Sequence, residues 1–236
     1  MSQSALPDGS AFLPDARAAL ARIEKRCPVA VEHVTLEGES YPLLMVQDIS
    51  ALISGDPFAD PSQFPTWTKL WEASILLACY VKQHSFPAGT RILELGAGLG
   101  LPSVVAAQKG LQVTASDHDP LVCDFLRVNA QLNNVEYTVV SLDWLAPPAL
   151  LSYDVIIAAE VVFREELFAP LLELCREVLA PEGCIYLAHD ASRRSLAPFL
   201  AKAADDFIVS AMKQTIRKDQ ATALTVILNR LRKKAP

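Results

Sequence analysis

Hydrophobic residues recur along this chain with different periods, and each period predicts a kind of element. Near the start, Ala19, Leu20 and Ile23 recur at helical spacing, which predicts a helix over Ala16–Arg26. Asp15 stands directly before this segment and is expected to cap the helix, because Asp is favoured at the N-cap. The regular structure therefore begins with a short amphipathic helix.

Two short strands are predicted next, over Val31–Leu36 and Tyr41–Val46. The residues between them, 37–40, include a glycine and have the composition of a hairpin turn, which indicates a β-hairpin. Ser54–Pro65 contains a glycine and several prolines and is expected to be an extended loop. We therefore expect an N-terminal extension over residues 1–66, followed by the main domain.

From Thr68 onward, strands and helices alternate. A helix that starts there has one apolar face, formed by Leu70, Ala73, Leu77 and Val81. The strands predicted after it are Arg91–Leu95, Leu111–Ser116, Glu136–Ser141, Tyr153–Ala159 and Cys184–His189. The helices predicted beside them are Pro102–Lys109, Pro120–Gln131, Glu165–Leu179 and Arg194–Ala203. Near-continuous apolar runs such as Val155–Ala159 are typical of parallel strands that are covered on both faces.

The chain ends with two predicted strands, Phe207–Met212 and Ala223–Leu228, on either side of a charged turn at residues 217–219. Because the connection is short, these strands should form an antiparallel hairpin at the edge of the sheet. Residues 67–236 thus predict an α/β domain with a Rossmann-like, seven-stranded, mostly parallel sheet. A common dinucleotide-binding fold has six parallel strands and lacks this ending.

Composition narrows the class of protein. The 236 residues, 51% hydrophobic and 20% charged, suit one α/β domain with a small extension. The net charge of -6 argues against a general affinity for nucleic acid, which requires a basic surface. No apolar stretch reaches membrane-spanning length and the start lacks the features of a signal peptide, so we expect a cytoplasmic protein. The five cysteines form no CxxC pair and the four histidines are scattered, so no metal site is predicted.

A glycine-rich turn follows the first strand of the main domain, with Gly96, Gly98 and Gly100 where the chain must turn sharply. A dinucleotide fingerprint that starts at Gly96 would need Gly or Ala at position 101, which is Leu101. Glu94, just before the turn, suits a cationic ligand and would repel a pyrophosphate. The pattern favours a cationic cofactor, and the alternative is that the glycines serve only a tight turn.

Acidic residues follow the next two strands. Asp117 comes about 20 residues after the start of the glycine turn, the spacing of a carboxylate that binds a ribose. Asp119 precedes Pro120 and is interpreted as a helix cap. Asp143 and Trp144 bring an acid and a flat ring to the same sheet edge, where an adenine could lie. Trp144 could alternatively be a packing residue.

The turn and Asp117 resemble motif I and the following acidic motif of the seven-β-strand S-adenosylmethionine methyltransferases. Three further features resemble the protein-lysine methyltransferases of methyltransferase family 16. Trp71–Ala73 is similar to the W-[DEP]-[AS] segment of that family, and the predicted hairpin resembles its β-extension. Glu160–Phe163 is similar to its [DE]-x-x-[YF] signature. The resemblance extends from about residue 31 to residue 230.

The resemblance implies a sheet order of 3-2-1-4-5-7-6 with strand 7 antiparallel, and S-adenosyl-L-methionine as the cofactor. The cofactor-binding residues that it implies are Trp71, Glu94, Gly96, Ala97, Gly98, Asp117, Asp143, Trp144 and Ala159. It also implies that Glu160 and Phe163 are catalytic residues on the acceptor side. Glu160 would hydrogen-bond the acceptor amine, and Phe163 would desolvate it. Glu160 could instead cap the following helix.

The function indicated by this resemblance is methylation of a lysine side chain on a protein partner. A methyltransferase for a small metabolite is the alternative, because the same fold hosts both activities. A third interpretation is a degenerate methyltransferase fold used as a binding module, and the intact glycine turn, Asp117 and Glu160 count against it. The sequence does not identify the acceptor, the number of methyl groups transferred or the oligomeric state.

Overall fold

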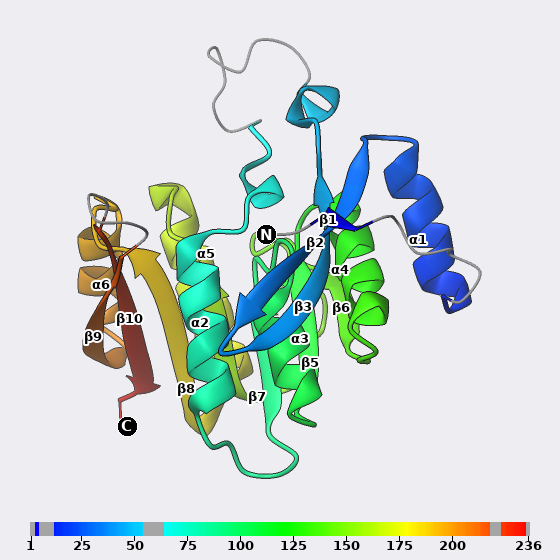
Figure 1. The fold of residues 1–236 in the computed structure, drawn as a ribbon. Coiled ribbons are helices and arrows are strands. Elements are labelled where there is room, and N and C mark those ends of the chain that lie inside the picture. Colours follow the sequence, from blue (N-terminus) through cyan, green and yellow to red (C-terminus); the bar gives the residue numbers. More distant parts are fainter. Residues whose placement is uncertain (1–2, 5–11, 54–63, 218–222, 235–236) are drawn as a thin grey trace.

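A computed structural model describes residues 3–4, 12–53, 64–217 and 223–234. Its centre is a seven-stranded sheet with the strand order β6-β5-β4-β7-β8-β10-β9 (Figure 1). These strands are β4 (Arg91–Leu95), β5 (Gln112–Asp117), β6 (Thr138–Ser141), β7 (Tyr153–Ala159), β8 (Leu179–Asp190), β9 (Phe207–Arg217) and β10 (Ala223–Lys233). Counted from β4, the order is 3-2-1-4-5-7-6, and the seventh strand, β10, is antiparallel to both neighbours. The predicted fold is confirmed.

Helices cover both faces of this sheet (Figure 1). They are α2 (Glu72–Gln83), α3 (Leu101–Gln108), α4 (Pro120–Leu132), α5 (Phe168–Val178) and α6 (Leu196–Ala203). The apolar side chains of β4 alternate between the faces: Ile92 joins a cluster with α2, α3 and α4, whereas Leu93 joins one with α5 and α6. This alternation follows from the two-residue period of a strand. It explains why apolar residues occupy consecutive positions in both β4 and β7.

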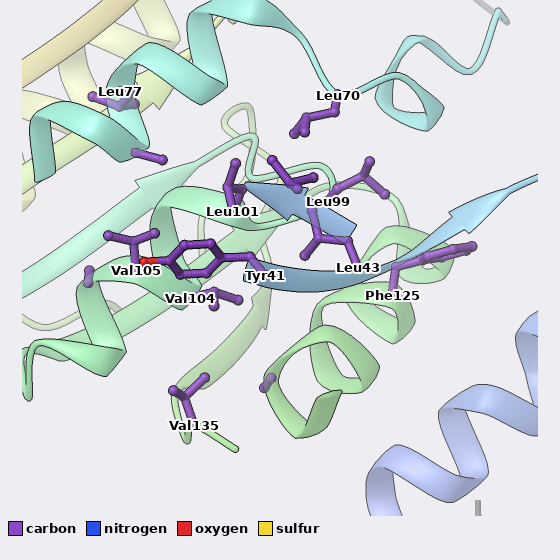
Figure 2. Close-up of a cluster of buried hydrophobic side chains, with 14 of the residues drawn as sticks. Tyr41, Leu43, Leu70, Leu77, Leu99, Leu101, Val104, Val105, Phe125 and Val135 are labelled. Carbon is purple, nitrogen blue, oxygen red and sulfur yellow. The ribbon is translucent and has the colours of Figure 1, made fainter. Parts of the chain in front are cut away.

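The N-terminal part forms a helix, α1 (Pro14–Glu24), and a separate sheet of β1 (Gln3–Ser4), β2 (Val29–Leu36) and β3 (Glu39–Val46). β2 and β3 form the predicted antiparallel hairpin. The buried side chains of α1 and the hairpin belong to the same hydrophobic cluster as those of α2 and α3. Figure 2 shows this cluster, with Tyr41 and Leu43 of the hairpin close to Leu101 of α3. The division of the chain at residue 66 stays a prediction.

The predicted starts of several helices are wrong. Helix α1 begins at Pro14 and its N-cap is Leu13, so Asp15 lies in the first turn and does not cap the helix. Proline suits the first helical position because it has no N–H that needs a partner there. Helix α2 begins at Glu72, not at Thr68, because the preceding residues form a 3-10 turn over Thr66–Thr68. Glu165–Leu167 likewise forms a 3-10 turn, after which α5 starts.

Several strands are longer than predicted. β2 and β3 each start two residues earlier than predicted, at Val29 and Glu39. β8 starts at Leu179, because Leu179 pairs with Tyr153 ahead of an irregularity in the ladder. Its residues 180–183 include a proline and a glycine, which indicate a turn in the sequence and which strands tolerate at such irregularities. β9 and β10 pair along their full lengths to Arg217 and Ala223, although much of β9 is polar and exposed. Most of the predicted Pro-rich loop and of the charged turn lies outside the described residues.

The sequence predicted neither a membrane-spanning segment nor a metal site. Among the described residues, no helix has the length and apolar character needed to cross a membrane. The same part of the chain has no group of three or more His, Cys, Asp or Glu side chains arranged to hold a metal ion. All five cysteines are free thiols. Burial raises the pKa of Cys175 to about 12, so this thiol is expected to remain protonated and unreactive.

The packing around Gly100 gives a stability prediction. Gly100 has a φ of 75°, and a Cβ atom there would lie 2.5 Å from Cδ2 of the fully buried Leu126. We expect Gly100→Ala to lower the free energy of unfolding by about 1–2 kcal/mol for the left-handed backbone and by about 1–3 kcal/mol more for the clash. Gly110 is the matched control, because its φ is 76° but no atom lies within 4 Å of the added Cβ. Equal losses for the two variants in denaturant unfolding would contradict this packing argument.

Candidate active site

A cavity of about 310 Å³ opens at the carboxyl ends of β4, β5 and β7. The connections of β4 and β7 lead to opposite sides of the sheet, and such a switch point is where open α/β sheets bind ligands. The cavity is lined by every residue that the sequence assigned to the site, namely Trp71, Glu94, Gly96, Ala97, Gly98, Asp117, Asp143, Trp144, Ala159, Glu160 and Phe163. The structure thus brings these residues together. Their individual roles stay predictions.

The glycine turn forms the floor of the cavity. Gly96, Gly98 and Gly100 all have positive φ, which glycine adopts without steric cost. A Cβ atom at Gly96 would lie 2.9 Å from the Val161 side chain, so only glycine fits the close approach of these two segments. The turn therefore exposes its backbone to a ligand.

Asp117 ends β5 and is buried beside the turn. Its carboxylate accepts hydrogen bonds from the backbone N–H groups of Gly98 and Asp119, each at 3.2 Å. His118 lies 3.3 Å away, and its hydrogen bond with Asp117 raises the pKa of the His118 ring. Asp119 points elsewhere: its carboxylate accepts from the N–H of Leu121 at 2.8 Å, which confirms it as the cap of α4. Asp117 alone of the two is placed to bind a ligand in the cavity.

Glu94 is almost completely buried at the inner end of the cavity, with 2% of its surface exposed. The hydroxyl of Ser103 donates a hydrogen bond to its carboxylate. Burial raises the pKa of Glu94 to about 8, because the charged form of a buried carboxyl loses its hydration. A cation bound next to this carboxyl would favour its ionised form.

This environment predicts a pH dependence of cofactor binding. Below about pH 8 the free protein holds Glu94 protonated, so binding of a cation releases a proton, and affinity should rise by up to about tenfold per pH unit. Above that pH the rise should end. Glu94→Gln should abolish it, and Ser103→Ala, which removes the hydrogen bond that stabilises the carboxylate, should shift the end of the rise to higher pH. Calorimetric titrations of the cofactor at pH values below and above 8 would measure this rise in affinity. The same pH dependence of affinity in Glu94→Gln and in the parent would contradict the role of Glu94.

Aromatic rings line the walls of the cavity. Trp71 precedes α2, its indole N–H donates to the Thr66 carbonyl at 2.8 Å, and the Lys69 ammonium lies 4.4 Å from its ring centroid. Trp144 also lines the cavity, is half-buried and packs against the hydrophobic cluster that includes residues of α5 and α6. Asp143, next to it, accepts a hydrogen bond from the N–H of Leu145 at 2.9 Å. Trp144 thus lines the cavity and also packs against the core, and its contact with an adenine stays a prediction.

Glu160 follows β7 with a φ of 58°, an unusual conformation for a residue with a side chain. Its carboxylate accepts from the N–H of Asp190 at 2.6 Å and from Nε of Arg193 at 2.5 Å. The Arg193 guanidinium also forms an ion pair with it, and only 7% of the Glu160 side chain is exposed. These hydrogen bonds and the ion pair hold the backbone of Glu160 in its strained conformation at the edge of the cavity. Glu160 does not cap a helix, since the N-cap of the next 3-10 turn is Arg164.

Phe163 lies on the same loop as Glu160, and half of its surface is exposed. The Arg164 guanidinium lies 5.5 Å from the centroid of its ring. The hydroxyl of Ser195 donates to the carbonyl of Val162, so the loop is tied to the segment after β8 at a second point. With the exposed Leu145, Phe163 makes one side of the cavity entrance apolar.

Sequence reasoning missed several residues of the site. Trp67 lines the cavity, and its ring packs 5.0 Å from that of Phe125 on α4. Lys69 and Arg164 place positive charge at the entrance. The proximity of Trp67 to Trp71 in the sequence was an available signal. No signal in the sequence pointed to Arg193, because its ion pair with Glu160 joins residues from separate loops.

The fold and the cavity define the class: a seven-β-strand methyltransferase whose cofactor is S-adenosylmethionine. An S-adenosylmethionine-dependent methyltransferase from Agrobacterium tumefaciens has a similar structure, with a TM-score of 0.61 and 19% identity over 86% of this chain and 70% of that one. The chain belongs to the lysine methyltransferase family, methyltransferase family 16, whose model matches residues 65–206.

Two curated relatives extend this comparison. A protein N-lysine methyltransferase of Xenopus tropicalis is 32% identical over 126 residues, which cover 50% of this chain and 58% of that protein. A histone-arginine methyltransferase of Homo sapiens is 36% identical over 115 residues, which cover 44% of this chain and 58% of that protein. The chain therefore matches little more than half the length of these relatives, and their names include two different acceptors.

Proposed function

We propose that this protein transfers a methyl group from S-adenosylmethionine to a lysine side chain of a protein substrate. The observation that carries the proposal is the pairing of a buried carboxylate, Glu160, with an exposed aromatic ring, Phe163, at the entrance of the cofactor cavity. A long aliphatic side chain with a terminal amine suits the apolar side of the entrance, formed by Phe163 and Leu145, with the carboxylate of Glu160 close by.

The residues of the cavity suit the cofactor. Glu94 is a buried carboxyl group for the cationic methionine portion, and Asp117 is a carboxylate positioned by backbone N–H groups for the two ribose hydroxyls. Trp144 provides an aromatic surface for the adenine. When bound, S-adenosylmethionine supplies an electrophilic methyl group on a sulfonium. A cavity of about 310 Å³ lies within the range of small-molecule sites.

The protein must then hold a neutral amine in line with the reacting methyl group. Phe163 and Leu145 remove water from the stem of the acceptor, and desolvation lowers the pKa of a lysine amine. Glu160 is positioned by Arg193 and the N–H of Asp190. Because a carboxylate has about four acceptor positions, Glu160 can still accept a hydrogen bond from the acceptor amine and orient its lone pair.

The relatives support a protein acceptor. Family membership and the name of the N-lysine relative favour lysine, whereas the arginine relative has a guanidinium acceptor. Lysine is proposed here because a lysine amine becomes a nucleophile simply by losing its proton in an apolar entrance, whereas arginine stays charged in proteins. The proposal also includes a cytoplasmic location and no nucleic-acid partner, as expected from the sequence.

Labelling in a lysate tests the proposal. The protein is incubated with a lysate and S-adenosylmethionine that carries a radiolabelled methyl group, and proteins are then separated from metabolites. We expect label in the protein fraction, recovered as methyllysine after hydrolysis, and no label with Gly98→Arg. Label confined to the small-molecule fraction would favour the metabolite alternative, and methylarginine would replace lysine as the acceptor.

A further inference from the structure

Two buried asparagines, Asn129 on α4 and Asn133 at its C-cap, hold the edge of the N-terminal hairpin. They lie one turn apart on the same face of the helix. Asn129 accepts a hydrogen bond from the N–H of Leu44 at 2.7 Å, and Asn133 donates to the carbonyl of Pro42 at 2.7 Å. Since β3 is an edge strand of its sheet, its outer backbone groups need partners, and α4 supplies them.

Asn129 makes a second contact that Asn133 lacks. Its Nδ2 donates to the carbonyl of Leu99 at 2.9 Å, and Leu99 stands in the glycine turn and lines the cavity. One fully buried side chain therefore links β3, α4 and the floor of the cofactor site. The three segments are far apart in the sequence.

Apolar packing supports this link. Tyr41 and Leu43 of β3 lie in the same cluster as Leu99 and Leu101, as Figure 2 shows. All four side chains are buried. Because close-packed interiors transmit small displacements, a shift of the hairpin would move the turn.

We propose that the N-terminal hairpin, which lies outside the cavity lining, is coupled to the cofactor site and that Asn129 is the positioning residue that couples them. The inference rests on the proposed function in one respect, that the cavity binds S-adenosylmethionine. Asn129 fixes the Leu99 carbonyl and thereby the backbone path of the turn, in which the Gly98 N–H, two peptide groups earlier, donates a hydrogen bond to Asp117. By linkage, cofactor binding stabilises the hairpin by the same factor as the hairpin favours cofactor binding.

Two variants separate this coupling from general stability. Asn129→Asp keeps the acceptor for the Leu44 N–H but loses the donor to Leu99, and it leaves the Leu99 carbonyl buried without a partner. Asn133→Ala removes the hydrogen bonds that this side chain donates to the carbonyls of Pro42 and Asn129, and it touches no atom of the turn. We expect Asn129→Asp to raise the Kd for S-adenosylmethionine about tenfold. Asn133→Ala should change it by less than about twofold, although both variants lower Tm.

Hydrogen exchange on the unsubstituted chain provides a second measurement that does not depend on a variant folding. Saturating S-adenosylmethionine should slow exchange of the Leu44 amide at least about threefold. If the parent protein binds no cofactor, the proposed function itself fails. If the parent binds but Leu44 exchange is unchanged, or if Asn133→Ala weakens binding as much as Asn129→Asp, the coupling is overturned while the proposed function stands.

Discussion

Asp117→Ala should weaken binding of S-adenosylmethionine about a hundredfold. The carboxylate is buried at the end of β5 and is oriented by the N–H groups of Gly98 and Asp119, so it can accept hydrogen bonds from both ribose hydroxyls. Hydrogen bonds to a charged group contribute about 1.5–3 kcal/mol each, so losing two of them predicts a loss of at least this factor. Isothermal titration calorimetry of the parent and the variant measures it directly.

Asp119→Ala is the matched control, because it removes a neighbouring carboxylate that caps α4 and does not line the cavity. It should lower the free energy of unfolding by about 1 kcal/mol. The affinity of Asp119→Ala for the cofactor should stay within about threefold of that of the parent, because the substitution removes a helix cap and no group of the cavity. An Asp117→Ala variant that binds as tightly as the parent, or as tightly as Asp119→Ala, would remove Asp117 from the ribose site.

Glu160→Gln should lower kcat about a hundredfold while the Kd for S-adenosylmethionine changes less than about threefold. The amide oxygen of glutamine can still accept from the N–H of Asp190, but the charge that holds Arg193 is lost. The loop that carries Phe163 then loses its alignment, and a displacement of about 1 Å in an active site can cost about a hundredfold in rate. Single-turnover kinetics with the acceptor fraction from the labelling experiment would separate kcat from cofactor binding.

Substitution of Arg193 distinguishes the two ways in which Glu160 can act. Arg193→Ala leaves the carboxylate in place but removes the ion pair, and Arg193→Lys restores one positive charge. If Glu160 acts by positioning the loop that carries Phe163, Arg193→Ala should lower kcat and Arg193→Lys should restore part of it. If Arg193→Ala has the kcat of the parent while Glu160→Gln has a lowered kcat, the role of Glu160 is restricted to direct contact with the acceptor.

The sequence predicted the central strands well because local signals were strong there. Arg91–Leu95 and Tyr153–Ala159 were predicted with the observed boundaries, since each is an apolar run bordered by residues that end a strand. The strand order came from the family resemblance. The site followed from the same source, because parallel strands deliver their carboxyl ends to one edge of the sheet.

What the sequence could not predict depends on contacts between distant residues. The pairing of Leu44 with Asn129 and that of Glu160 with Arg193 join segments whose relative position is set by tertiary packing. Neither has a sequence pattern. The early start of β8 at Leu179 was hidden for the opposite reason, because a local turn signal was overridden by strand pairing.

The central claim is that the cavity above the glycine turn binds S-adenosylmethionine. The most direct test is calorimetric titration of this cofactor into the 236-residue chain and into its Gly98→Arg variant. The side chain of an arginine at position 98, where Gly98 lines the cavity, would occupy the space of the ligand. Saturable binding of one cofactor per chain that is lost in the variant is the predicted result. Absence of binding to the parent, or equal binding by Gly98→Arg, would contradict the account.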